Sequence, residues 1–166
     1  SIVQTMDRAN HRELVLGTHG RSADQWDIWQ AVFGPVGPDG YPADIWNPLT
    51  GVIDHQVAQY WHDHFDLDAW LDSHWATLAP KLNGKLHVYV GDMDSYYLND
   101  AVYEMQKTIE AHKDPAITAD FTFGRLQPHC FDGTYRKMSE EQLYMPQMLQ
   151  RLLKTAPPGA DMSWNY

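Results

Sequence analysis

Apolar side chains recur at helical spacing in the middle and near the end of the chain. One run follows positions i, i+3, i+4, i+7, i+8 and i+11 and predicts a helix over 67–78, with Asp66 as N-cap and Pro80 just past its end. A shorter helix is expected around 57–61, a longer one over 98–109 and a last one over 143–153, interrupted early by Pro146.

Alternating apolar and polar residues predict strands between these helices. The strand over 85–90 ends at Gly91, and a second, over 117–123, ends at Gly124. The apolar run at 13–16, closed by Gly17, is consistent with a further buried strand. Strands that alternate with helices predict an α/β fold with a parallel sheet.

The length of 166 residues fits one domain, 1–166, but the charge is uneven within it. Residues 22–80 contain nine aspartates, six of the seven tryptophans and no Lys or Arg, and they form an acidic, Trp-rich excursion. The formal charge of −10 argues against a nucleic-acid partner, whose phosphates require Lys and Arg. No apolar run approaches the roughly 20 residues of a membrane span.

Ionisable side chains follow both predicted strands. The first strand leads into Gly91-Asp92-Met93-Asp94, and the second leads through Gly124 to Gln127-Pro128-His129. In open α/β sheets, functional groups gather beyond the carboxyl ends of the strands. A serine hydrolase needs an imidazole as general base and a carboxylate that orients it, so this order of Asp and His favours such chemistry.

On these two motifs, residues 85–155 resemble the C-terminal part of an α/β-hydrolase-fold esterase, and most resemble bacterial esterases of the esterase D and feruloyl-esterase-like type. Residues 13–80 resemble them only loosely. The resemblance implies that Asp94 is the acid and His129 the base of a Ser-His-Asp triad, with Asp92 as the alternative acid. It also implies a small carboxylic ester as substrate and no cofactor.

The chain lacks the nucleophile that this family requires. No Gly-x-Ser-x-Gly occurs, and the nearest string, Gly20-Arg21-Ser22-Ala23-Asp24, lacks the second glycine. The family order places the Ser upstream of Ser1. The chain is therefore expected to be the C-terminal part of a longer protein, inactive alone, whose partner is the N-terminal remainder or another chain that carries the Ser. A soluble protein, secreted or periplasmic at full length, is compatible with this sequence, which does not identify the compartment.

Other interpretations of these residues stay open. Asp94 fits a helix N-cap, His129 a structural histidine, and Cys130 a buried, inert thiol. The domain would then be a non-catalytic hydrolase-like binding or scaffold subunit. A third hypothesis is a metal-dependent hydrolase that uses His62 and His64, with Asp66, although two histidines two residues apart on a helix point away from each other.

The tryptophans of the excursion also have several interpretations. Trp61, Trp70 and Trp75 are expected to pack helices onto the sheet as apolar anchors. Trp26, Trp29 and Trp46, expected in loops, would supply an aromatic wall for the sugar or phenolic group of a substrate. An interface with the missing part of the protein is the third interpretation, because Trp is favoured at interfaces.

Overall fold

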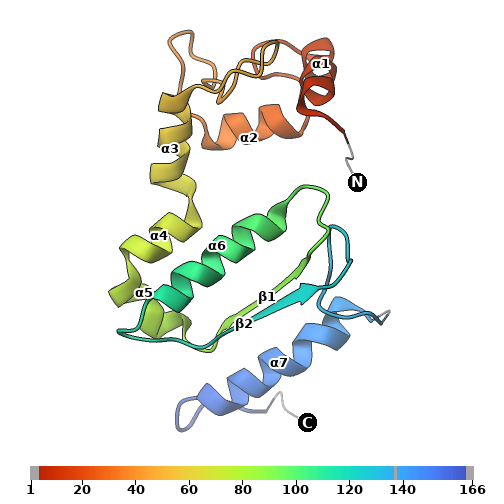
Figure 1. The fold of residues 1–166 in the computed structure, drawn as a ribbon. Coiled ribbons are helices and arrows are strands. Elements are labelled where there is room, and N and C mark those ends of the chain that lie inside the picture. Colours follow the sequence, from red (N-terminus) through yellow and green to blue (C-terminus); the bar gives the residue numbers. More distant parts are fainter. Residues whose placement is uncertain (1–3, 137, 164–166) are drawn as a thin grey trace.

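The computed structural model describes residues 4–136 and 138–163 (Figure 1). These residues form an α/β arrangement of helices and a small parallel sheet, as the alternation of patterns predicts. The helices and strands are α1 (Met6–Leu16), α2 (Gln25–Phe33), α3 (His55–Phe65), α4 (Leu67–Ser73), α5 (Trp75–Leu82), β1 (Leu86–Gly91), α6 (Leu98–Ala111), β2 (Ala119–Gly124) and α7 (Glu140–Thr155).

The sheet consists of β1 and β2, which pair in parallel from Leu86 opposite Ala119 to Gly91 opposite Gly124. Helix α6 connects the two strands and covers one face, and α7 lies on the other side (Figure 1). Tyr89 of β1 and Gln147 of α7 exchange hydrogen bonds at 3.3 and 3.4 Å. The predicted strands, and the helix between them, are confirmed.

The core lies between α4, α5, α6 and the sheet. Its buried centre is formed by Leu71, Trp75, Ala79 and Ile109. The indole N–H of Trp75 donates to the carbonyl of Pro115 at 2.9 Å, which ties α5 to the segment before β2. Of the three tryptophans expected to pack helices onto the sheet, only Trp75 belongs to this core.

The other two tryptophans lie elsewhere. Trp61 of α3 packs against Phe33 of α2, with ring centroids 5.5 Å apart. Trp70 is half exposed and stacks on His74 at 3.7 Å. Trp61 therefore joins two helices of the excursion, while Trp70 remains largely at the surface.

The prediction of a strand at 13–16 is wrong, because these residues form the C-terminal end of α1. Thr5 caps the start of this helix, and its hydroxyl accepts the N–H of Arg8 at 3.3 Å. Helical spacing places Ala9 and Glu13 on one buried face. There the Glu13 carboxylate accepts the N–H groups of Trp26 and Asp27 at 3.0 and 2.9 Å, and so caps α2. An apolar run of four residues does not distinguish a strand from a helix end.

The prediction of one continuous helix over 67–78 is also wrong, because the structure has two helices there. Asp66 caps α4 as predicted, but the helix breaks at His74, and Pro80 lies inside α5 rather than beyond it. Trp75, after the break, is buried, whereas Trp70, before it, is half exposed. Helix α7 likewise continues through Pro146; it begins at a capping box formed by Ser139 and Gln142.

Within the described residues, none of the helices combines the length and the apolar character that crossing a membrane requires.

Candidate functional site

The carboxyl ends of β1 and β2 lie side by side, and the loops that leave them are joined by backbone hydrogen bonds. The N–H of Asp92 donates to the carbonyl of Gly124 at 3.0 Å, and the N–H of Met93 donates to that of Gln127 at 3.0 Å. A Cβ added at Gly91 would lie 2.2 Å from the Gln127 carbonyl oxygen, so only glycine permits this approach. The two loops therefore hold each other in place.

Asp94 and His129 meet in this pair of loops. Asp94 Oδ2 lies 2.9 Å from His129 Nδ1, within hydrogen-bond distance. The Asp94 side chain is 3% exposed and the His129 side chain is 39% exposed. A buried acid thus holds one edge of a partly exposed imidazole. In the described part of the chain, Nε2 of His129 makes no hydrogen bond.

Tyr96 completes the surroundings of this pair. Its backbone N–H donates to Asp94 Oδ1 at 2.7 Å. Its ring lies against the imidazole of His129 with the centroids 4.7 Å apart and the planes at 66°. With Oδ1 held by Tyr96, Oδ2 accepts a proton from Nδ1 and favours the tautomer in which Nε2 is the acceptor. The sequence analysis missed Tyr96, although its place two residues after an acid in a turn is typical of a backbone donor to that acid.

The hydrogen bonds of Asp94 also set its charge. Burial raises the pKa of the Asp94 carboxyl, but the hydrogen bonds from His129 and from the Tyr96 N–H, with the charge of His129, outweigh burial and lower the pKa below its ordinary value of 3.8. Asp94 is therefore ionised at neutral pH, as an acid that orients an imidazole must be.

This pKa predicts how stability depends on pH. A carboxyl whose pKa is lower in the folded protein stabilises the fold above 3.8, and this contribution is lost as the pH falls through the folded-state pKa. The free energy of unfolding should therefore decline between about pH 5 and pH 2, and less steeply in Asp94→Asn than in the wild type. Urea titrations of both proteins over this range measure the difference. Equal slopes would contradict the assigned bonds.

Asp92, the alternative acid, has a different partner. Its Oδ1 accepts the backbone N–H of Leu126 at 2.6 Å, so its carboxylate fixes the second loop. Leu126 and Cys130, on either side of His129, adopt left-handed backbone conformations with φ of 58° and 64°. Such conformations cost on the order of 1–3 kcal/mol in residues other than glycine and cluster at functional sites. Cys130 is exposed, so the expectation of a buried thiol is wrong.

The close approach of the Gln127–Pro128 backbone to Gly91 leads to a second prediction. Gly91→Ala should push the Gln127–Pro128 backbone away and cost about 1–3 kcal/mol of unfolding free energy. Met93→Ala in the same turn is the control, because Met93 is 52% exposed, and it should cost less than about 0.5 kcal/mol. Thermal or urea unfolding of the two variants measures both values. A Gly91→Ala protein as stable as the control would show that the loops are not in close contact.

The three tryptophans proposed as an aromatic wall lie together, but only one of them lies in a loop. Trp26 and Trp29 lie on α2, so the loop assignment is wrong for them, because Asp24 caps a helix before them. Trp46 remains in a loop, bridged to Ile53. The Trp26 ring lies edge-on to Trp29 and to Trp46, at 4.9 and 5.5 Å. Trp26 and Trp46 line a cavity of about 340 Å³ between α1 and the 48–53 loop.

The residues of the metal hypothesis lie on or beside α3. His62 Nδ1 is 2.9 Å from Asp63 Oδ1, whereas His64 stacks on Tyr60 at 4.1 Å. Asp66 Oδ1 accepts N–H groups at the start of α4. Residues 4–136 and 138–163 contain no group of three His, Cys, Asp or Glu side chains placed to share an ion.

The serine nearest to a nucleophile motif also has a local partner. The Ser22 hydroxyl accepts the N–H of Asp24 at 3.1 Å, in the loop between α1 and α2. A helix rather than a strand precedes it, so the geometry differs from that of a nucleophile elbow.

No family model, curated protein or solved structure matches this chain.

Proposed function

We propose that this chain supplies the acid and the base of a serine esterase of the α/β-hydrolase fold, whose nucleophile lies in an upstream segment or another chain. The observation that carries the proposal is the 2.9 Å contact between the buried Asp94 carboxylate and the half-exposed His129 imidazole. The pair stands at the carboxyl ends of adjacent parallel strands, where catalytic groups of such sheets gather.

In this mechanism, Nε2 of His129 takes the proton of the serine hydroxyl as the serine oxygen attacks the ester carbonyl carbon. The proton then passes to the leaving alcohol oxygen as the C–O bond breaks, which leaves an acyl-enzyme. In the second half-reaction, water attacks the acyl carbon and Nε2 takes a proton from it. Nε2 then returns this proton to the serine oxygen as the bond between that oxygen and the acyl carbon breaks and the carboxylic acid is released. Asp94 stays ionised, keeps the proton on Nδ1 and stabilises the imidazolium.

The amount of exposed surface supports an additional polypeptide beside this chain. A compact protein of 19.1 kDa exposes about 8,400 Å², whereas this chain exposes 11991 Å². The excess, about 3,600 Å² on this one chain, is larger than the roughly 800 Å² per partner that a standard interface buries. Parallel sheets are normally covered on both faces and contain more than two strands.

The edge of β1 that does not pair with β2 is where we place that polypeptide. A hollow of about 700 Å³ runs along it, lined by Val88, Phe131, Tyr144, Met148 and Leu152 among others. Met148 and Leu152 of α7 are 58% and 55% exposed. Exposed apolar side chains beside an unpaired strand edge are expected where a further strand joins the sheet. Helix α7 already covers this face of the sheet, so the added polypeptide would lie beside β1.

The proposal is tested by ester hydrolysis with the full-length protein and with the 166-residue chain. We expect the full-length protein to hydrolyse a short-chain p-nitrophenyl ester and the isolated chain to be inactive. Mixing the chain with its separately produced upstream segment should restore hydrolysis. A full-length protein that folds but hydrolyses neither short-chain nor aromatic esters would contradict the esterase and favour a scaffold subunit.

A further inference from the structure

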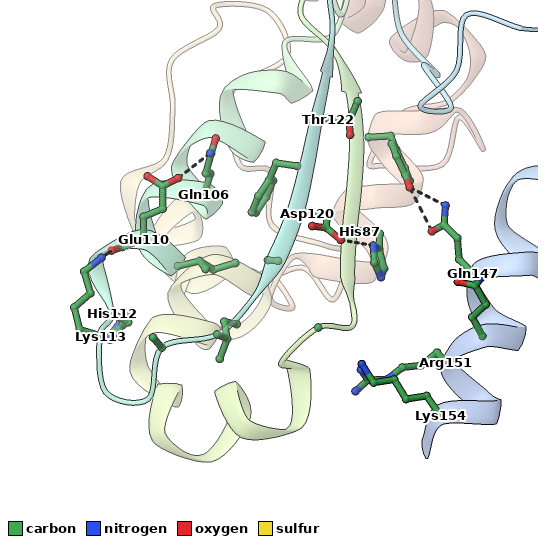
Figure 2. Close-up of a pocket in the computed structure, with 18 residues that line it drawn as sticks. His87, Gln106, Glu110, His112, Lys113, Asp120, Thr122, Gln147, Arg151 and Lys154 are labelled. Atoms are coloured by element: carbon green, nitrogen blue, oxygen red, sulfur yellow. Dashed lines mark hydrogen bonds and ion pairs between the residues drawn. The ribbon is translucent and has the colours of Figure 1, made fainter. Parts of the chain in front are cut away.

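Two hollows of the structure differ in whether their polar side chains have partners. A groove of about 980 Å³ lies along β2 between α6 and α7 (Figure 2). The two acids that line it are paired within the chain. Asp120 lies 3.0 Å from His87 Nδ1, and Gln106 donates to the Glu110 carboxylate at 2.8 Å. The cavity of about 340 Å³ beside α1 contains instead a buried amide group that has no partner for its nitrogen in the described part of the chain.

This amide belongs to Asn10 of α1, which is only 6% exposed. The indole N–H of Trp46 donates to Asn10 Oδ1 at 3.0 Å. Because an indole N–H can only donate, this bond fixes which end of the amide is the oxygen. The Nδ2 group makes no hydrogen bond to residues 4–136 or 138–163. A buried donor of this kind needs an acceptor that the described chain does not supply.

The wall opposite α1 is held in shape by its own hydrogen bonds. Asn47 Oδ1 accepts the N–H groups of Leu49 and Thr50 at 2.9 and 3.0 Å. Trp46 and Ile53 form an antiparallel bridge at the base of the same loop. The cavity therefore exists before a ligand enters, and its volume is in the range of small-molecule sites. Its apolar lining comes from Met6, Trp26, Trp46, Pro48, Leu49 and Ile53.

The polar groups around this cavity indicate an uncharged ligand. The described side chains that line it include the acid Asp7 but no Lys, Arg or His. A second cavity, of about 120 Å³, borders the same Asn10 and has Glu13 and Asp27 in its wall. An anion would be repelled by these carboxylates, and a cation would meet the Nδ2 donor of Asn10. Asn10 thus marks a polar end of a largely apolar cavity.

We propose that the cavity of about 340 Å³ binds a small, uncharged aromatic carbonyl compound. Its ring lies against Trp26 and Trp46, since flat aromatic rings pack well on indoles. Its carbonyl oxygen accepts a hydrogen bond from Asn10 Nδ2. The lining comes from residues 6–53, whereas Asp94 and His129 follow β1 and β2, so the proposal does not rest on the esterase function.

The test measures binding of acetophenone to the full-length protein by isothermal titration calorimetry. Isopropylbenzene, which has a similar shape but no acceptor, is the matched control. We expect a Kd for acetophenone below about 1 mM. Asn10→Leu removes the amide and should weaken acetophenone binding about three- to tenfold, the effect of one neutral hydrogen bond. It should not weaken isopropylbenzene, whose binding shows that the cavity of the variant is intact.

Two neighbouring variants locate the site independently of the buried Asn10. Ile53 and Val52 are 52% and 67% exposed, but only Ile53 lines the cavity. Ile53→Asp places a carboxylate in an apolar wall and should weaken the binding of both compounds at least about tenfold. Val52→Asp should change it by less than about twofold. Benzoate, the anionic counterpart of acetophenone, should bind at least about tenfold more weakly than acetophenone.

A full-length protein that binds neither compound overturns the proposal, as it would if the upstream part of the protein filled the cavity. Acetophenone binding that Ile53→Asp leaves unchanged places the site elsewhere and also overturns it. Equal weakening of both compounds in a folded Asn10→Leu protein refutes the hydrogen bond to Asn10.

Discussion

His129→Ala in the full-length protein is expected to lower kcat/KM for ester hydrolysis by about 10⁴-fold or more, while folding remains intact. The imidazole is half exposed and its only hydrogen bond within the described residues is the one to Asp94, so its removal leaves the core unchanged. Its loss removes the only group near these strand ends that we assign as general base.

The chain offers a matched control for this variant. His87 also pairs with an aspartate, Asp120, at 3.0 Å, and its side chain is 38% exposed against 39% for His129. It lies within β1 rather than at a strand end. His87→Ala should therefore change kcat/KM by less than about threefold. Steady-state kinetics on both variants, with circular dichroism as a check of folding, compares them. Equal losses would show that His129 has no special role.

Asp94→Asn is expected to lower kcat by about 10⁴-fold, because an amide can donate to Nδ1 and stabilise the wrong tautomer. Replacing the carboxylate also removes the charge that stabilises the imidazolium in the transition state. Circular dichroism and urea unfolding of the variant, compared with the wild type, distinguish this loss of activity from a structural one.

Asp92→Asn is the control, because Asp92 lies in the same turn and its Oδ1 accepts only the Leu126 N–H among the hydrogen bonds described. An asparagine oxygen can still accept that bond, so activity should fall by less than about tenfold. If Asp92→Asn were the more damaging of the two, the acid of the pair would be Asp92 and the contact described here would not be the catalytic one.

The part of the fold that could be predicted from sequence is the β1–α6–β2 unit. Alternating apolar residues and terminal glycines identify both strands, and the same glycines place Asp94 and His129 at one edge of the sheet. Their contact follows from strand order, because the carboxyl ends of neighbouring parallel strands meet. The sequence left Asp92 and Asp94 as alternatives, and only the geometry separates them.

Other features depended on contacts that periodicity does not encode. The helix at 13–16 is stabilised by Glu13, which bonds to backbone groups 13 and 14 residues later. The chain breaks at His74, with Trp75 after it buried and Trp70 before it half exposed, although both fit the same apolar spacing. Cys130 has a left-handed backbone conformation and is exposed, which apolar patterning does not indicate. For Glu13, a tertiary contact outweighed the local preference.

The most direct test of the account is fluorophosphonate labelling of the full-length protein, followed by peptide mapping of the labelled residue. The reagent reacts with a serine only when an adjacent base activates it. We predict a single labelled serine upstream of residue 1 of this chain, with labelling lost in His129→Ala and retained in His87→Ala. An unlabelled protein, or a labelled serine whose reaction does not depend on His129, would contradict the claim that Asp94 and His129 serve a catalytic serine.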